Sequence, residues 1–458
     1  MSEREFRDYS PKRDREAVRR VYRECGWLDK GKEPALEALL KGSRAIVAEV
    51  NAEAECVVLT AQGTMRYLDE DLPASFVTGV TTSRVARKQG LASELTARCV
   101  ARDAAEGSLV SCLGMFEQGY YDRLGFSTGG YEHWYAFDPA ELTLVAKPRA
   151  PRRIAADDWK AVHAARLRRR RVHGGCNLSA PELTKGEMLW TTNGFGLGYF
   201  DGRRGALSHY VWCDGKESEH GPYTISWIVF RTREEFLELM GLVKSLGDQV
   251  HLVRMQEPPG IQLQDLLRQP FKARQVTERA KYETKLSATA YWQARICDLA
   301  GCLERTHLDG EPVRFNLVLV DPIESLLPKR TDWRGVGGEY VVTLGPASGA
   351  EPGKSRSLPT LKASVGAFTR LWLGVRPATG LSFTDSLAGS GSLLEALDEV
   401  LRLPEPKPDW DFFGPPGAER DEPRAGECAW DRTRAGDRPE SGVTLSREGG
   451  CQGRRGLR

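Results

Sequence analysis

Hydrophobic residues in the first 140 positions recur at helical spacing in some segments and at strand spacing in others. In residues 14–25, Val18, Val21 and Tyr22 lie on one face of a helix, and Gly26 marks its end. Segments rich in β-branched and aromatic residues predict strands. The pattern therefore predicts strands over residues 5–9, 44–50, 56–67, 76–82, 109–116 and 131–137, helices over 14–25 and 35–40, and a third helix beginning at Leu91.

Similar patterns continue after the proline-punctuated basic segment 148–153, which we interpret as a linker. The run from Gly194 to Gly198 precedes a predicted strand, so we interpret it as a tight β-connection and not a nucleotide loop. A third unit is expected to begin near Ala290, where residues 291–296 lead into a helix. In this half of the chain the predicted helices are 157–171, 232–246, 297–305, 361–375 and 393–401, and the predicted strands are 199–204, 205–213, 223–230, 249–255, 313–320 and 338–344.

This order of elements predicts a mixed fold of the α+β and α/β classes. For 458 residues and the usual domain size of about 100–200 residues, two to four domains are expected. We place the boundaries so that they divide the chain into residues 1–145, 146–286, 287–413 and a tail, 414–458. The tail has too few large apolar side chains to offset its ordering entropy, so it is predicted to be disordered.

The stretch from Phe76 to Phe126 carries the first chemical signal. Its strand is followed by a short basic loop that ends at Gly90, and a helix then begins. The first N–H groups of a helix have no intrahelical partner and the macrodipole is positive there, so this turn suits a diphosphate, with Arg87 and Lys88 adding charge. Because many α/β proteins contain such a turn and bind no phosphate, the signal is weak by itself.

The next predicted strand, 109–116, is followed by Gly-Tyr-Tyr-Asp-Arg-Leu-Gly-Phe at positions 119–126. In this order the two segments resemble the GNAT superfamily of N-acetyltransferases. The resemblance implies that residues 87–92 are the R/Q-x-x-G-x-G/A pyrophosphate loop for acetyl-coenzyme A (acetyl-CoA). It also implies that Tyr121 is the general acid, since a phenol with a pKa near 10 still protonates a departing thiolate at neutral pH. Tyr120 is expected to pack.

The same resemblance assigns the contacts with acetyl-CoA. Backbone groups at the edge of the motif strand would hold the acetyl and pantetheine part, the loop and first helical turn the pyrophosphate, and the next strand would line the cofactor. These residues are Val80, Thr81, Thr82, Lys88, Gln89, Gly90, Leu91, Ala92, Ser93, Phe116 and Glu117.

Composition argues against several other kinds of protein. The 65 lysines and arginines against 63 acidic residues produce no general attraction to nucleic acid or an anionic membrane. The ten cysteines match no zinc or redox motif, so we expect reduced, mostly buried thiols and no metal site. The N-terminal residues contain no apolar signal segment, and no stretch reaches the ~18 apolar residues of a membrane span. We therefore expect a soluble cytoplasmic protein.

Over residues 5–413, a GNAT unit, a degenerate GNAT unit and a unit similar to the sterol carrier protein follow one another, and the sequence Pro-Asp-Trp-Asp-Phe-Phe stands at 408–413. This succession resembles the Eis (enhanced intracellular survival) acetyltransferase family. The resemblance implies a homohexamer and an amine acceptor such as an aminoglycoside, a polyamine or a lysine side chain. The competing hypothesis is a catalytically weak protein that binds lipid or another small molecule through the third unit.

The implied mechanism is direct transfer in a ternary complex. An amine attacks the thioester carbonyl, backbone N–H groups of the motif strand stabilise the oxyanion, and Tyr121 protonates the sulfur of coenzyme A. An acyl-cysteine route through Cys112 is not expected, because this residue lies within a strand and no histidine has a position that suggests a partner.

The resemblance further implies a base at the end of the chain, namely the α-carboxylate of a terminal phenylalanine. That position is Phe413 here, but the chain continues to Arg458, and a neutral peptide bond cannot act as a base. Four alternatives stay open. The tail is removed after Phe413; the side chain of Asp411 or Glu117 takes the role; a water chain relays the proton; or the carboxylate matters little and the tail is harmless.

We predict that a chain ending at Phe413 acetylates amines faster than the full chain, with similar binding of acetyl-CoA, because the free carboxylate is restored. Steady-state kinetics of the two proteins measure this difference. Equal kcat values, with the mass of the full chain intact through the assay, would contradict the prediction.

Overall fold

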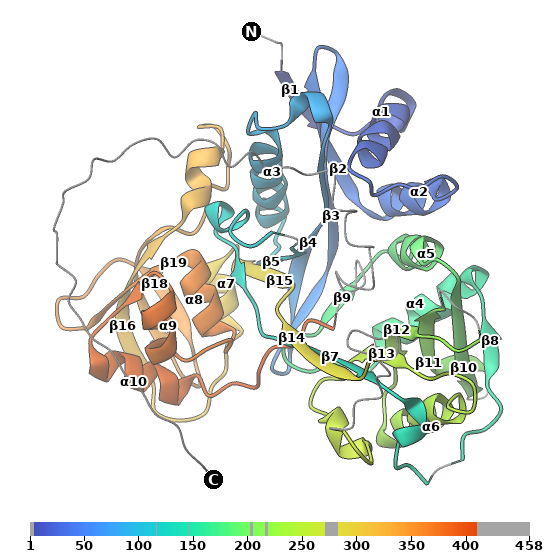
Figure 1. Cartoon of the computed structure of the whole chain (residues 1–458). Helices are drawn as coiled ribbons and strands as arrows, with labels where there is room; N and C mark the ends of the chain where they lie inside the picture. The colour runs from blue at the N-terminus through green and yellow to red at the C-terminus, as the bar shows by residue number, and fades with distance from the viewer. Residues whose placement is uncertain are drawn as a thin grey trace, which may run out of the picture. The chain divides into compact units, whose positions relative to one another are not determined.

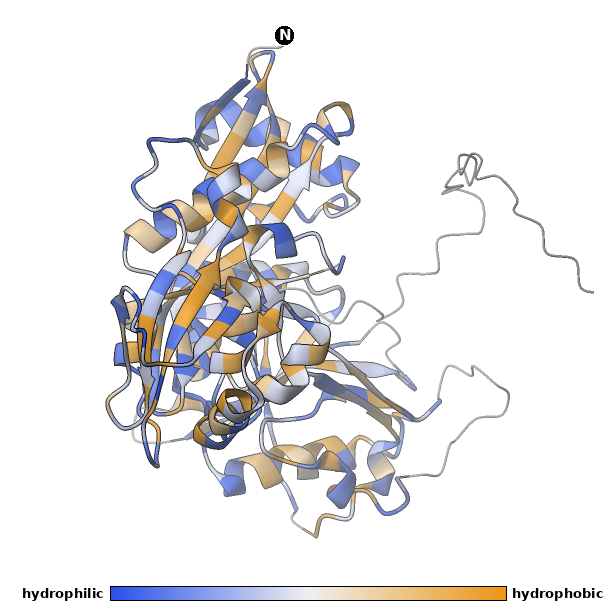
Figure 2. Cartoon of the chain, turned by 90° about the vertical axis from the view of Figure 1, so that its left-hand side faces the viewer, coloured by the Kyte–Doolittle hydropathy of each residue, from blue (hydrophilic) through white to orange (hydrophobic). Residues whose placement is uncertain are grey.

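The computed structural model of the chain describes residues 4–115, 117–145, 147–201, 205–215, 219–270 and 283–409. Within these residues, three β-sheets are accompanied by helices (Figure 1). Apolar residues are concentrated along the strands (Figure 2), as expected where a sheet face is covered by helices. None of the described helices combines the length and the apolar character needed to cross a membrane.

The first sheet is built mainly from the N-terminal part of the chain. Its strands are β1 (Arg4–Asp8), β2 (Arg44–Val50), β3 (Glu53–Tyr67), β4 (Glu70–Thr82), β5 (Val110–Gly114), β6 (Ser127–Thr128), β9 (Cys176–Leu178) and β15 (Trp292–Ile296), in the order β1-β2-β3-β4-β5-β15-β6 with β9 paired to β3. Its helices are α1 (Pro11–Glu24), α2 (Glu33–Gly42) and α3 (Leu91–Ala105). The predicted elements of this region are confirmed, and the strand over 44–50 has the predicted bounds.

The second sheet follows the linker. Its strands are β7 (Glu132–Phe137), β8 (Arg152–Ile154), β10 (Gly194–Asp201), β11 (Ala206–Asp214), β12 (Tyr223–Val229), β13 (Val253–Gln256) and β14 (Lys285–Thr289), in the order β14-β7-β13-β12-β11-β10-β8. Its helices are α4 (Trp159–Arg168), α5 (Pro181–Trp190) and α6 (Arg233–Ser245). The glycine run 194–198 is not the tight β-connection that the sequence predicts, because these residues lie inside β10; as part of a strand they also form no nucleotide loop. A Cβ atom on Gly196 would lie 2.9 Å from Ile154 Cβ, so the glycine lets neighbouring strands approach.

Two strands belong to other sheets than the sequence predicts. Residues 131–137 are predicted to close the first unit, but β7 pairs with β13 and β14 of the second sheet. The place beside β5 is taken by β15, which is predicted to open the third unit; Ala294 pairs with Cys112 there. Both predictions are wrong because the choice of a neighbouring strand depends on distant segments. The domain boundaries placed at 145 and 287 stay predictions.

The third sheet contains β16 (Val313–Val320), β17 (Gly338–Leu344), β18 (Gly349–Pro352), β19 (Thr360–Ser364) and β20 (Leu387–Ala388), in the order β18-β17-β16-β19-β20. Its helices are α7 (Leu299–Glu304), α8 (Val365–Trp372), α9 (Ala378–Thr384) and α10 (Gly391–Val400). The predicted strands 313–320 and 338–344 have the observed bounds. The helix predicted over 361–375 is wrong at its start, because β19 pairs in parallel with β16 and Ser364 then caps α8.

A single apolar core joins the first and third sheets. The Tyr67 ring stacks on Trp372, with centroids 4.4 Å apart, and the Tyr67 hydroxyl donates to the Trp372 carbonyl at 3.0 Å. The Trp372 indole donates in turn to Thr306 Oγ1 at 2.9 Å. Because each buried aromatic ring also has its polar group paired, these contacts stabilise one particular arrangement of the two sheets.

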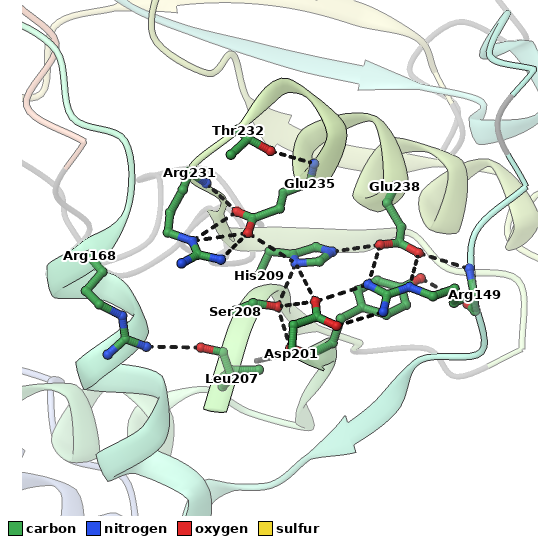
Figure 3. Close-up of polar contacts among 11 residues, drawn as sticks. Arg149, Arg168, Asp201, Leu207, Ser208, His209, Arg231, Thr232, Glu235 and Glu238 are labelled. Atoms are coloured by element: carbon green, nitrogen blue, oxygen red, sulfur yellow. Dashed lines mark hydrogen bonds and ion pairs between the residues drawn. The ribbon is translucent and has the colours of Figure 1, made fainter. Parts of the chain in front are cut away.

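A polar cluster in the second sheet surrounds the buried His209 (Figure 3). The His209 ring lies 2.8 Å from Ser208 Oγ and 3.0 Å from Glu238 Oε2. Ser208 is itself buried and its hydroxyl donates to the Tyr199 carbonyl at 2.9 Å, so this serine is not placed as a nucleophile. Arg149 bridges the carboxylates of Asp201 and Glu238, at 2.7 and 2.8 Å. The cluster therefore ties the linker to β10, β11 and α6.

The stability contributed by Arg149 should depend on acid pH. Hydrogen bonds from Arg149 lower the pKa of Asp201 and of Glu238, each to about 2. Carboxylates with lowered pKa values contribute stability above their unfolded values, near 4, and lose it as the pH falls through that range toward 2. We predict that Arg149→Met lowers the urea midpoint at pH 7 and that this difference shrinks between pH 5 and pH 3.

The control for this experiment is Arg233→Met, which removes an exposed arginine from the first turn of α6. Its difference from the natural chain should stay small at every pH. A difference for Arg149→Met that is constant from pH 7 to pH 3 would show that the two carboxylates are not linked to folding through this arginine.

Candidate active site

The two central strands of the first sheet separate in the middle of β4. Residues from Ala74 to Val77 pair in parallel with β5, and β5 then ends at Gly114. The rest of β4, including Val80, Thr81 and Thr82, pairs only with β3 among the described strands. One edge of β4 thus presents backbone groups without a strand partner, in the position where an extended ligand can add to the sheet.

A β-bulge lies at the point of separation. The register with β3 passes from Val77 opposite Thr60 to Gly79 opposite Leu59, so Thr78 is the extra residue. A Cβ atom on Gly79 would lie 2.6 Å from the hydroxyl of the buried Tyr22 in α1. Glycine is therefore required for α1 to pack against the bulge, and the packing of α1 supports the direction that β4 takes.

The basic loop leads from the end of β4 to the start of α3. Gly90 is the residue before the helix and has φ 81°, a left-handed conformation that glycine adopts without strain. No side chain caps α3, and residues 87–90 are exposed. The N–H groups of the first turn are thus available to an anion, with the positive end of a 15-residue helix behind them. This geometry fits the diphosphate of acetyl-CoA.

The predicted loop residues divide into those that face solvent and those that support the loop. Gln89 accepts from Arg4 at 3.1 Å and donates to the Val85 carbonyl at 3.2 Å, so its side chain closes the loop. Leu91 is buried in the core beneath the loop. Lys88 is exposed and has φ 61°. For Gln89 and Leu91, a contact with phosphate would therefore be made by the backbone.

Tyr121 packs against the apolar core to which Leu91 belongs. Like Val80 and Ala92, it is partly buried against a cluster that includes Leu95 of α3 and Leu113 of β5. It also makes edge contacts with Tyr120 and Phe126, at centroid distances of 4.8 and 6.2 Å. Burial raises the pKa of Tyr121, and no described residue forms a hydrogen bond with its hydroxyl. Tyr121 therefore stays a neutral donor.

Tyr120 has a contact that the sequence does not predict. The Ser93 hydroxyl, in the first turn of α3, donates to the Tyr120 hydroxyl at 3.2 Å. This bond links the start of the helix to the tyrosine turn across the mouth of the site. Nothing in the sequence signals the pair, because 27 positions separate the two residues.

The other residues predicted for the site differ in exposure, and two of them lie outside the described residues. Glu117 is exposed just after β5, whereas Phe116 and Phe413 lie outside the described residues. Cys112 is buried, and its neighbour Cys176 together with burial raises the pKa of its thiol. A buried thiol with a raised pKa is a poor nucleophile, which agrees with the prediction that the reaction does not pass through an acyl-cysteine at Cys112.

The second sheet repeats the strand separation without the phosphate-binding features. Its strands β12 and β13 pair in parallel over three residue pairs and then part around a pocket lined by residues such as Trp227, Phe230 and Lys407. The helix between these two strands, α6, is capped by Thr232 and carries Glu234 and Glu235 in its first turn. Carboxylates at that position repel an anion, so this turn is unsuited to a diphosphate.

Part of the chain matches a known protein family. Residues 12–129 match the family described as acetyltransferase (GNAT) domain. No match is found among curated proteins.

Solved structures share the fold over most of the chain. A conserved protein from Enterococcus faecalis has 19% identity and a TM-score of 0.69, with 87% of this chain and 97% of that chain covered. A GCN5-related N-acetyltransferase from Anabaena variabilis has 12% identity and a TM-score of 0.68, with 88% and 98% covered. Eis1 from Mycobacterium abscessus has 16% identity and a TM-score of 0.67, with 89% and 100% covered.

The family match covers β4, the basic loop, α3 and the tyrosine turn, and the three solved structures share the fold over 87–89% of the chain. The chain therefore carries a GNAT acetyltransferase domain within the fold of Eis1 and other GCN5-related N-acetyltransferases.

Proposed function

We propose that the protein transfers the acetyl group of acetyl-CoA directly to an amine of a cationic acceptor, in a ternary complex. The observation that carries this proposal is the common position of three features around the separation of β4 and β5. These are the free edge of β4, the uncapped start of α3 after Gly90, and the neutral hydroxyl of Tyr121. A thioester, its diphosphate and its departing sulfur require these three kinds of group.

Each feature has a separate role in the proposed reaction. Backbone groups of Val80, Thr81 and Thr82 would align the acetyl and pantetheine part, and an N–H group at the bulge would stabilise the oxyanion. The first turn of α3, with Lys88 and Ser93, would hold the pyrophosphate. Tyr121 would supply the proton that the sulfur needs as it departs.

The proposal also includes a base and a class of acceptor. Tyr121 does not serve as the base, because burial raises its pKa and keeps it protonated. Glu117 is exposed near the end of β5 and is a candidate, while Phe413 and Asp411 lie outside the described residues. Aminoglycosides, polyamines and lysine side chains remain the proposed acceptors, and a homohexamer the proposed assembly.

The lipid-binding alternative has less support. The apolar residues of α8 and α10 that would line a lipid tunnel, including Phe368, Leu371 and Leu397, are buried in the packed core of the third sheet. Side chains in such contact fill the interior that a lipid would occupy. The similarity of this unit to the sterol carrier protein stays a proposal.

We predict that Tyr121→Phe lowers kcat by about 10²-fold with little change in the KM for acetyl-CoA, because only the proton donor is removed. The matched control is Tyr120→Phe, which removes the bond with Ser93 and retains the ring contact. Thiol release and the mass of the acetylated amine measure both. An unaltered kcat in Tyr121→Phe would exclude its role as acid.

The raised pKa of Tyr121 also predicts the alkaline side of the pH profile. An acid is active in its protonated form, so a pKa raised above that of a free phenol, near 10, moves the loss of activity to higher pH. We expect kcat/KM to rise as the acceptor amine is deprotonated and to show no fall up to about pH 10. A fall near pH 8, in a protein that is still folded, would assign the acid to another group.

A further inference from the structure

The turn that carries Tyr121 is short, and its second half, Leu124, Gly125 and Phe126, is buried. The Tyr121 carbonyl accepts from Leu124 N at 2.9 Å and from Phe126 N at 3.3 Å, so the path of residues 121–126 determines where the tyrosine ring lies. Asp122 and Arg123 face solvent. The position of the turn must therefore be set by whatever holds its buried side.

An arginine from another part of the chain holds that side. Arg295 of β15 is fully buried, and its guanidinium donates to the Leu124 carbonyl. The same group forms an ion pair with Asp321 at 2.6 Å and lies 5.1 Å above the Trp333 ring. Gln293, two residues earlier on β15, donates to Asp122 at 3.0 Å. One strand thus contacts both ends of the short helical turn η2 (Asp122–Leu124).

The partner of Arg295 is itself rigidly held. Asp321 follows β16 of the third sheet, and its carboxylate accepts from Ile323 N at 3.2 Å and from Val336 N at 2.9 Å. With Arg295, these donors use both carboxylate oxygens in a buried site. The position of the guanidinium is therefore determined by the backbone of the segment that joins β16 to β17.

The fit around Gly125 is equally tight. Gly125 has φ 79°, and a Cβ atom there would lie 2.6 Å from Val365 Cγ1 and 2.9 Å from Arg295 Nη1. Val365 begins α8 of the third sheet. Glycine is required both by the backbone conformation and by the close approach of these side chains.

A buried ion pair is not an efficient way to gain stability, because desolvation offsets much of the attraction and apolar residues of similar volume often do as well. The pair instead fixes the relative orientation of the groups it joins, because a planar guanidinium binds one carbonyl and one carboxylate in a defined geometry. We propose that Arg295 and Asp321 are positioning residues for Tyr121, so that the third sheet contributes to acetyl transfer by placing the acid. This inference rests on the proposed role of Tyr121.

The test is a double-mutant cycle of Arg295→Lys with Tyr121→Phe in the full chain. Lysine retains the positive charge beside Asp321, but one ammonium on a shorter side chain cannot reproduce the fork that reaches Leu124 as well. We expect Arg295→Lys to lower kcat about 10-fold, with an almost unchanged KM for acetyl-CoA, since a small misplacement of a reacting group is costly. In the Tyr121→Phe background the same change should have almost no further effect.

Two more variants separate positioning from folding. Arg334→Lys changes a partly exposed arginine that pairs with Glu324 in the same region, and it should leave kcat unchanged. Gln293→Leu removes only the bond with Asp122 from a buried site of similar volume. It should lower kcat about two- to threefold when Tyr121 is present and have almost no effect on kcat in the Tyr121→Phe background. This variant also provides the test if Arg295→Lys does not fold.

The outcomes distinguish the two proposals. An unchanged kcat in Tyr121→Phe overturns the proposed acid, whatever Arg295 does. A reduced kcat in Tyr121→Phe, combined with effects of Arg295→Lys that multiply in the double variant, leaves the acid in place and shows that Arg295 does not act through Tyr121. Unchanged kcat in both folded Arg295→Lys and Gln293→Leu would also overturn the positioning role.

Discussion

The separation of β4 from β5 is the constraint on which the site depends. Parallel strands satisfy each other's backbone groups, so β4 can present an open edge only if something forces it away from its neighbour. The bulge at Thr78 and the packing of Tyr22 against Gly79 do this from one side. From the other side, β15 covers the second edge of β5 and keeps that strand in the sheet.

The exchange of β7 and β15 makes the three sheets depend on one another. The chain leaves the first sheet after β6, adds β7 to the second sheet, and returns to the first with the short β9 and then with β15. The third sheet then packs on the first through Tyr67 and Trp372. A GNAT domain cut out at residue 145 would thus lack the strand beside β5 and would expose part of its core. The tyrosine turn would lose its contacts with Arg295 at the same time.

The sequence predicts local features well and distant partners poorly. Helical and strand periodicities locate most elements, including β2, β16 and β17 at their observed bounds, because each is encoded in its own segment. Gly90 is predicted at the start of α3 because the basic loop that ends in glycine and the helical spacing after it are both local features. The neighbours of β7 and β15, and the strand β19, depend on residues far along the chain. Arg295 could be noticed only as a charge within an apolar strand.

The burial of Tyr121 bears on its proposed chemistry in two opposing ways. A raised pKa makes a phenol a weaker acid, which by itself slows proton donation. A thiolate that forms in the same apolar surroundings is also poorly solvated, and burial raises the pKa of a thiol as it does that of a phenol. The two proton affinities would thus rise together, and the driving force for transfer would be preserved. What matters is then the position of the hydroxyl, and that position depends on the turn that Arg295 holds.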